Sequence, residues 1–265
     1  MFIKKEKTKL SPATLNLLEE CPRCFWLALR KKVVRPRGPM PSVATGLDSA
    51  ITRYFHYYRQ KKQLPPFLQE ALPKGRLVNE ELFDLRFGIK AKWLIYEEEA
   101  QPFVLLGKLD DCLVEEDKYA PLDYKTRASP PGEIHPSYQL QMDIYTFLLE
   151  NNKEKPMPVN NRAYLLYFTP RFLKEGETAE VIDVLKAFPF EFTLKSLHTN
   201  PDRVKEVLSK AMEIISSEKP PQPGKLCEFC RWAEDWGKVR NLSRDEAEKE
   251  KIAEEDDFDD GLLFR

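Results

Sequence analysis

Leu122-Asp123-Tyr124-Lys125-Thr126 is the stretch that decides the fold, and it follows Gly107-Lys108-Leu109-Asp110 after a gap of hairpin size. Side chains alternate along a β-strand, so we expect Asp123 and Lys125 on one face of a sheet and Tyr124 on the other. If the two segments are antiparallel neighbours, Asp110 lies near Asp123. The sequence therefore predicts two carboxylates and one ammonium group at one point on a sheet.

Such a cluster suits the cleavage of phosphodiesters. Carboxylate oxygens bind Mg²⁺ or Mn²⁺, which neutralises phosphate charge and acidifies a bound water, and a lysine can orient that water or stabilise the anionic transition state. Taken alone, an Asp-x-Lys triplet on a strand is more often an exposed ion pair. The neighbouring sequence has to decide between these two interpretations.

The regions around this stretch alternate between strand and helix patterns. Short apolar runs separated by charged turns predict strands, and apolar residues at helical spacing predict helices. We expect helices from Ser11-Pro12, over 46–60, over 137–150 and over 200–217, and strands over 93–97, 103–115, 119–125, 162–168 and 188–194. This order predicts an α/β fold in which a mixed central sheet is flanked by helices.

A family resemblance rests on three ordered motifs. After Gly107-x-x-Asp110 and Asp123-Tyr124-Lys125-Thr126 comes Tyr138-Gln139-Leu140-Gln141-Met142-Asp143-Ile144-Tyr145, in which Gln141 and Tyr145 share one helix face. Over residues 11–232 the chain resembles RecB-type PD-(D/E)XK nucleases, including CRISPR-associated and AddB-like members. The resemblance implies a restriction-endonuclease-like core and a Mg²⁺- or Mn²⁺-dependent deoxyribonuclease. We interpret it as an exonuclease that acts on single strands or ends in DNA processing or repair.

The resemblance also implies roles for single residues. The metal ligands would be Asp110, Asp123 and the backbone carbonyl of Tyr124. Lys125 would serve catalysis, and Gln141 and Tyr145 would border the active site.

One position departs from the family pattern. Relatives often place a histidine ligand four residues after the glycine that opens the first core helix, and counting from Gly46 leads to Ala50. Asp48 and His56 are nearby but out of register. The departure leaves an alternative open, in which the chain is a catalytically impaired nuclease-fold protein that binds DNA or acts as a scaffold.

Two CxxC pairs stand near opposite ends of the chain, at Cys21-Pro22-Arg23-Cys24 and Cys227-Glu228-Phe229-Cys230, with 202 residues between them. Four thiolates can hold Zn²⁺ or an iron–sulfur cluster, and the site would join the two ends of the domain. The resemblance implies a 4Fe-4S cluster. However, relatives with bracketing cysteines place one before the core and three after it, so structural Zn²⁺ is the alternative. Cys112 stands alone and is predicted to be buried.

Charge is distributed unevenly. The formal net charge is −1, but residues 241–265 carry ten acidic and four basic residues, a net −6 that leaves +5 for residues 1–240. We therefore predict a mildly basic nuclease domain over 1–240 and a disordered acidic tail over 241–265. The tail resembles an acidic-hydrophobic peptide that docks a protein partner.

Basic residues interleaved with tyrosines favour contact with single-stranded DNA, through phosphates and stacked bases. These residues are Lys31, Lys32, Arg35, Arg37, Arg53, Arg59, Lys61 and Lys62, with Tyr54, Tyr57 and Tyr58. Further candidates for substrate or metal contact are Arg127, His135, His56, Glu97, Glu98 and Glu99. No apolar run is long enough to span a membrane and the start lacks a signal-peptide pattern, so we expect a cytoplasmic protein.

Overall fold

The computed structural model describes residues 7–36, 38, 42–154, 156–171 and 190–237. Its contacts divide the chain into two compact units, and unit 1 comprises Met1–Asn16 and Pro36–Ser216. Unit 2 comprises Leu17–Arg35 and Ser217–Arg265. The predicted acidic tail and Arg37 lie outside the described residues.

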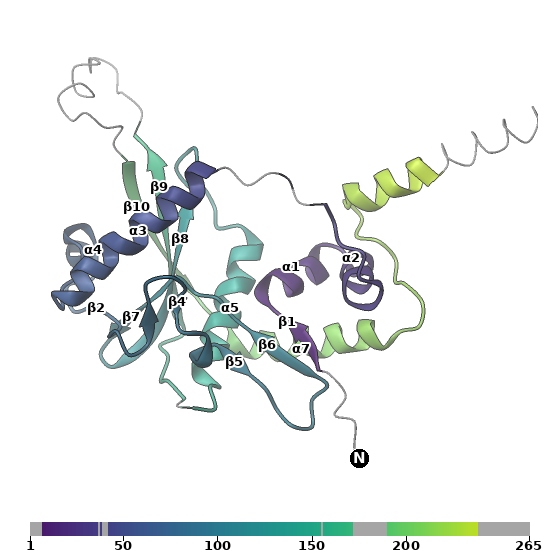
Figure 1. The fold of residues 1–265 in the computed structure, drawn as a ribbon, viewed down its shortest axis with the longest axis horizontal. Coiled ribbons are helices and arrows are strands. Elements are labelled where there is room, and N and C mark those ends of the chain that lie inside the picture. The colour runs from purple at the N-terminus through teal and green to yellow at the C-terminus, as the bar shows by residue number, and fades with distance from the viewer. Residues whose placement is uncertain (1–6, 37, 39–41, 155, 172–189, 238–265) are drawn as a thin grey trace, which may run out of the picture. The chain divides into compact units, whose positions relative to one another are not determined.

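A five-stranded mixed sheet forms the centre of unit 1 (Figure 1). The strand order is β10 (Phe190–His198), β9 (Arg162–Pro170), β8 (Lys118–Thr126), β7 (Asp111–Glu115) and β2 (Arg76–Leu77). β8 and β9 run parallel, and the other neighbours run antiparallel. Parallel neighbours need a crossover, which helix α5 (Pro136–Glu150) supplies.

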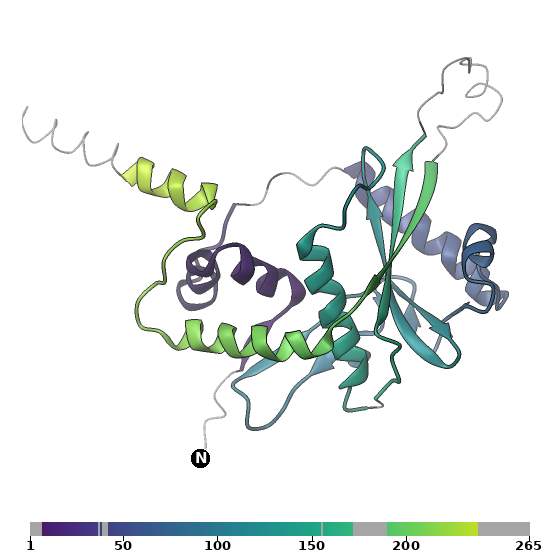
Figure 2. The same ribbon diagram turned by 180° about the vertical axis from the view of Figure 1, so that it is seen from behind.

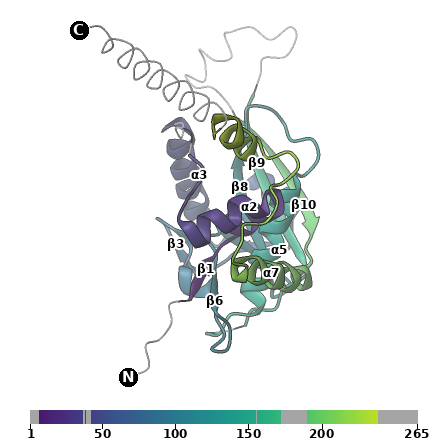
Figure 3. The same ribbon diagram turned by 90° about the vertical axis from the view of Figure 1, so that its right-hand side faces the viewer.

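Helices cover both faces of this sheet. Ile51 and Phe55 of α3 (Ser42–Gln60) pack with Leu122 and Tyr124 of β8 in a buried apolar cluster, to which Leu68 of α4 (Pro66–Ala71) also belongs. The alternate side chains of β8 face α5, which lies beside α7 (Pro201–Ser216) (Figures 2 and 3). The predicted α/β fold, with a mixed central sheet flanked by helices, is confirmed.

Smaller elements complete unit 1. β1 (Thr8–Leu10) pairs parallel with β6 (Phe103–Leu106), which also pairs with β5 (Ile95–Tyr96). β3 (Phe83–Asp84) and β4 (Gly88–Ile89) form a short hairpin, followed by the 3₁₀ helix Ala91–Trp93.

The single strand predicted over 103–115 is wrong in one respect. It divides into β6 and β7, because the chain leaves one sheet and enters another between Leu106 and Asp111. The Gly107 N–H donates to the Leu94 carbonyl, 2.8 Å away, which extends the β5–β6 pairing by one residue before the chain turns towards β7. The break leaves Asp110 outside regular structure, directly before β7.

Unit 2 is built around the four cysteines. α1 (Pro12–Glu20) enters it, and α2 (Pro22–Trp26) and the π-helix Leu27–Lys31 follow. Cys21 is the N-cap of α2, so the first CxxC pair opens this short helix. The Trp26 indole N–H donates to the Ser217 carbonyl at 2.9 Å, which ties the two chain segments of the unit together. Among the described helices of both units, none combines the length and apolarity needed to cross a membrane.

Candidate active site

Asp110 and Asp123 are held together by the backbone of β8. The Tyr124 N–H donates a hydrogen bond of 2.9 Å to Oδ2 of Asp110. This donor is available because the β7–β8 pairing ends at Asp111 and Leu122, so Tyr124, two residues further along β8, has no backbone partner in β7. The antiparallel arrangement predicted from the sequence therefore places the two carboxylates next to each other.

The remaining predicted residues join this pair through side chains. Lys125 forms an ion pair with Oδ2 of Asp123 and donates to Oε1 of Gln141 at 3.2 Å. The Gln141 amide donates to Oδ1 of Asp123 at 3.4 Å and to the Tyr145 hydroxyl at 3.0 Å. The structure thus brings Asp110, Asp123, Lys125, Gln141 and Tyr145 into one network, and the Tyr145 hydroxyl donates onward to the Lys108 carbonyl.

Burial changes the proton affinity of the carboxylates. Removal from water, followed by the negative charge of Asp123, raises the pKa of Asp110 to about 7. Burial also raises the pKa of Asp123, against the opposing effect of the Lys125 ammonium. Oδ2 of Asp123 is buried and forms the ion pair with Lys125, so a bound cation would share this carboxylate with the lysine. Hard oxygen donors with mutual repulsion fit a divalent cation such as Mg²⁺ or Mn²⁺.

The Tyr124 carbonyl is the third predicted ligand. Within a strand, the N–H and C=O of one residue point to the same edge. Since the Tyr124 N–H faces Asp110, its carbonyl faces the same edge of β8. Its side chain points to the opposite face, where the ring lies 4.8 Å from that of Phe55.

A buried ion pair between Arg59 and Asp111 is linked to the two site carboxylates through Tyr124. Arg59 of α3 contacts both carboxylate oxygens of Asp111 at 2.5 Å, and the Tyr124 hydroxyl donates to the same carboxylate at 2.9 Å. The Arg59 and Asp111 side chains are 2% and 0% exposed. The prediction that Arg59 contacts DNA is therefore wrong, because its guanidinium is enclosed and paired. Sequence alone gave no sign of a partner 52 positions away.

Gly88 fixes the segment that carries Asp110. Its φ is +77°, and a Cβ at this position would lie 2.3 Å from the Leu109 carbonyl oxygen and 2.7 Å from that of Asp110. Only glycine combines this left-handed backbone with such a close approach. The neighbouring Ile89 N–H donates to the Leu109 carbonyl at 2.9 Å, so the β3–β4 hairpin supports the turn before β7.

Asp48, which is out of register when residues are counted from Gly46, influences both carboxylates. It is exposed on α3, and its negative charge raises the pKa of both Asp110 and Asp123. Asp48 and Phe55 are two helical turns apart and share the side of α3 that faces β8. Helical spacing from the apolar residue Phe55, in place of counting from Gly46, would have indicated that Asp48 faces the sheet.

His56 and the acidic run lie elsewhere. The His56 ring stacks on Phe83 with 5.9 Å between centroids, and its Nε2 lies 3.9 Å from Glu80. Glu97 pairs with Lys7 at 3.1 Å, and Glu98 accepts from Tyr96. The contacts of His56, Glu97 and Glu98 place these side chains with other partners, so the structure does not support them as candidates for the carboxylate site.

The other predicted contact residues have varied positions. The His135 ring accepts from the Ser137 N–H at 3.2 Å and caps α5. Tyr54 and Tyr57 are exposed, and Lys61 lies over the Tyr57 ring at 4.3 Å. Arg35 of unit 2 pairs with Glu20 and contacts a cysteine sulfur. Cys112 is buried, as predicted.

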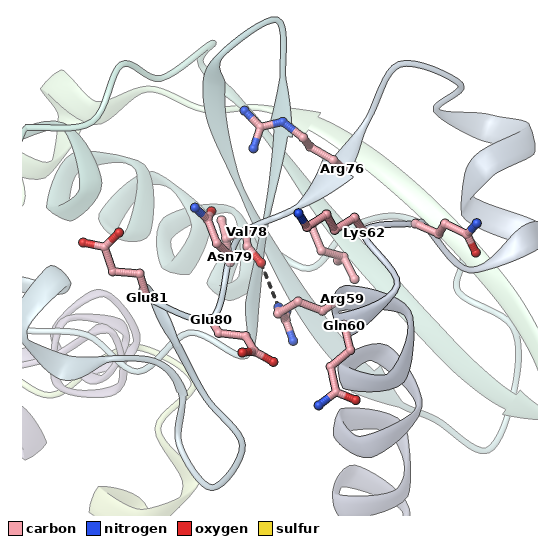
Figure 4. A pocket seen from close by; sticks show the side chains of 10 residues that line it. Arg59, Gln60, Lys62, Arg76, Val78, Asn79, Glu80 and Glu81 are labelled. Atoms are coloured by element: carbon pink, nitrogen blue, oxygen red, sulfur yellow. Dashed lines mark hydrogen bonds between the residues drawn. The ribbon is translucent and has the colours of Figure 1, made fainter.

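A separate pocket of about 640 Å³ opens beside the end of α3 (Figure 4). Its lining includes Lys62, Arg76, Glu80 and Glu81. Arg59 and Val78 also line it, and the Arg59 Nε donates to the Val78 carbonyl at 2.8 Å. None of the predicted catalytic residues lines this pocket. The candidate catalytic residues therefore lie in the carboxylate network and not in this pocket.

The four cysteines meet in unit 2 and are all buried. Their Sγ atoms lie within 4.8 Å of one another, with 3.8 Å between Cys21 and Cys230 and 3.5 Å between Cys24 and Cys230. Backbone N–H groups of Gly224 and Cys24 donate to the Cys21 sulfur at 3.2 and 3.5 Å. The predicted metal-binding group is therefore assembled from both ends of the sequence.

The profile of the PD-(D/E)XK nuclease superfamily matches residues 47–234. No curated protein matches the sequence. Among solved structures, SSO0001 is 12% identical with a TM-score of 0.37, over 82% of this chain and 80% of its own. An alkaline exonuclease (LHK-Exo) from Laribacter hongkongensis is 9% identical with a TM-score of 0.40, over 92% of this chain and 95% of its own.

The assignment rests on the profile and not on these distant structural likenesses. The matched region covers most of the chain and contains the carboxylates, the lysine and the α5 glutamine. The chain belongs to the PD-(D/E)XK nuclease superfamily.

Proposed function

We propose that the chain is a Mg²⁺- or Mn²⁺-dependent deoxyribonuclease of the RecB type, which acts as an exonuclease on single strands or ends in DNA processing or repair. The observation that carries the proposal is the convergence of Asp110, Asp123 and Lys125 on one point of the sheet, next to Gln141. Superfamily membership supports phosphodiester hydrolysis as the reaction.

Each residue has a role that follows from its contacts. Asp110, Asp123 and the Tyr124 carbonyl would hold the cation, which when bound supplies charge neutralisation at the phosphate and acidification of water. Lys125 is kept in place by Asp123 and Gln141, so its ammonium can donate to an attacking water or to the phosphate oxygens. Gln141 and the Tyr145 hydroxyl fix the orientation of this lysine.

Asp48 supplies an acidic group on α3, two residues before Ala50, the position at which relatives often place a histidine. Its charge reaches both carboxylates, whereas Ala50 is exposed and offers no ligand atom. This observation favours an active enzyme over the competing function, an impaired nuclease-fold protein that binds DNA or serves as a scaffold. The absence of an imidazole from the network of described residues is the reason to keep that alternative in the test.

The experiment compares cleavage by the purified full-length chain and its variants in Mn²⁺ and in Mg²⁺. Substrates are end-labelled single-stranded and double-stranded DNA, closed circular single-stranded DNA, and a matched RNA. Test variants are Asp110→Asn and Lys125→Ala. Matched controls are Asp117→Asn, in the exposed β7–β8 turn, and Lys118→Ala, exposed on the same strand as Lys125.

The proposal predicts cation-dependent release of nucleotides from linear DNA and no cleavage of the circle. It predicts a loss of roughly 10²-fold or more in rate for both test variants, and near wild-type rates for the controls. Cleavage of the circle would exclude a purely exonucleolytic enzyme. Equal rates in wild type and both test variants would reject the site. DNA binding without cleavage in either cation would select the impaired alternative.

A further inference from the structure

We propose that the four-cysteine centre binds one tetrahedral Zn²⁺ ion, in place of the 4Fe-4S cluster that the family resemblance implies. The inference rests on the distances between the sulfur atoms. They are 3.8 Å for Cys21 and Cys230, 3.7 Å for Cys24 and Cys227, and 3.5 Å for Cys24 and Cys230. All four sulfurs lie within 4.8 Å of one another.

These distances match the geometry of a single ion. With Zn–S bonds of about 2.3 Å, the edges of a regular tetrahedron of sulfurs are about 3.8 Å long. A 4Fe-4S cluster places each thiolate on a different iron at the corner of a cube, which separates the cysteine sulfurs by roughly 6 Å. The observed group is too compact for the cube, so the residues present do not fit that cluster.

The surrounding backbone holds the sulfurs in this compact arrangement. The Gly224 N–H reaches the Cys21 sulfur at 3.2 Å, and a Cβ on Gly224 would lie 2.1 Å from the Glu20 carbonyl oxygen. The Cys230 N–H faces the Cys227 sulfur at 3.5 Å. Expansion to the dimensions of a cube would separate the two chain segments and break the close approach of Gly224 to Glu20.

Charge compensation supports the same conclusion. Four thiolates around one divalent ion carry two net negative charges, and burial makes uncompensated charge costly. The Arg35 guanidinium lies 3.1 Å from the Cys227 sulfur and is itself held by Glu20 at 2.5 Å. With the N–H donors at Cys21 and Cys227, Arg35 offsets the charge of the site and orients one of its ligands.

The test measures the metal that the full-length chain carries. The protein is produced in medium that contains both iron and zinc and is purified in parallel under air and without oxygen, so that an oxygen-labile cluster is not lost. Iron, zinc and acid-labile sulfide are measured per chain, and the visible spectrum is recorded. Replacement by Co²⁺ then reports the ligand field.

We expect one zinc per chain, no stoichiometric iron or sulfide in either preparation, no visible colour, and the intense d–d bands of tetrahedral cobalt after replacement. Four irons with four sulfides in the oxygen-free preparation would overturn the proposal. A single iron without sulfide, or protein folded without any metal, would overturn it as well. None of these readouts depends on nuclease activity, so the result stands apart from the proposed function.

The Arg35 contact allows a second measurement with a matched control. Arg35→Ala should weaken zinc affinity by about 10–100-fold in competition with a chromophoric chelator, as the loss of groups that orient metal ligands usually does. Arg30→Ala removes an exposed arginine from the same unit and should leave the affinity unchanged. Wild-type affinity in Arg35→Ala would remove the charge-compensating role of this arginine.

Discussion

The Tyr124 backbone N–H donates to the Asp110 carboxylate, so a main-chain atom of one site residue holds a side chain of another. Tyr124 itself is fixed on the opposite face of β8, where its hydroxyl donates to Asp111. The position of the Asp110 carboxylate is therefore set by the sheet. Changes on the α3 side of the sheet can reach the candidate active site through Tyr124 without contacting the substrate.

The raised pKa of Asp110 predicts a pH-dependent stability of the protein without Mg²⁺ or Mn²⁺. Between the unfolded pKa, about 3.9, and the folded pKa, about 7, only the folded state binds this proton. The unfolding free energy should therefore fall as pH rises through this window and reach its low value above pH 7. Asp110→Asn should remove the contribution of Asp110, leave a smaller dependence from Asp123, and stabilise the protein at pH 8 by roughly 1–3 kcal/mol.

Urea unfolding at pH 5 and pH 8, in buffer free of Mg²⁺ and Mn²⁺, measures this effect. Asp117→Asn serves as the control, because Asp117 is exposed. The same pH dependence in wild type and Asp110→Asn would contradict the prediction. Added Mn²⁺ should stabilise the wild type more than Asp110→Asn, since the ion binds the folded site.

Asp48→Asn should shift the pH profile of cleavage. Removal of a negative charge near Asp110 and Asp123 lowers the pKa of both carboxyl groups. The acidic limb of the rate profile should therefore move to lower pH in saturating Mn²⁺, while the cation concentration needed for half-maximal rate at pH 8 increases. Glu70→Gln, at an exposed position of α4, should change neither quantity. An unchanged profile in Asp48→Asn would place this residue outside the site.

Gly88→Ala should displace Asp110 and lower activity, although Gly88 itself is not a residue of the candidate active site. The new Cβ would meet two backbone carbonyls and require a left-handed conformation, so we expect a loss of roughly 1–3 kcal/mol in unfolding free energy. Cleavage should fall with it, because Leu109 and Asp110 have to move. Gly132→Ala is the control, since no atom lies within 4 Å of its Cβ position. Urea unfolding and the cleavage assay are measured together, and wild-type values for Gly88→Ala in both would refute the close approach.

Arg59→Met should destabilise the protein strongly, because it leaves the Asp111 carboxylate buried without its cation. Loss of one partner of a buried pair costs about 3–5 kcal/mol. The double variant Arg59→Met, Asp111→Asn removes the charge as well and should recover part of this loss. Urea unfolding of the two single variants and the double variant measures the coupling, and additive losses would disprove the direct interaction.

Sequence alone predicted the part of the site that local alternation controls. Asp123 and Lys125 are two residues apart on β8, so strand alternation places their side chains on the same face, as predicted. Gln141 lies on the next helix and contacts Lys125. The separation of β6 and β7 was not predicted, since an apolar run gives no sign of a change of sheet. Residues 62–92 contain elements as short as the two-residue strands β3 and β4. Such short strands are held by tertiary contacts, so the local sequence pattern does not predict them.

Arg59 shows the limit of charge patterns. It stands among basic and tyrosine residues that resemble a DNA-binding surface, and only the fold reveals that its partner is Asp111. For Asp48 the sequence interpretation erred in the opposite direction. Counting from Gly46 placed this residue out of register, but in the structure its charge affects Asp110. In both cases the missing information is which face of α3 meets the sheet.

The separation of the cysteine pairs by 202 residues has a consequence during synthesis. At about 5–20 residues per second, the second pair leaves the ribosome roughly 10–40 s after the first. Until then only two of the four ligands exist, and unit 2 cannot close around an ion. Unit 1 of a nascent chain can therefore fold before unit 2 binds its metal. A cell short of that metal would accumulate protease-sensitive new chains before it lost mature protein.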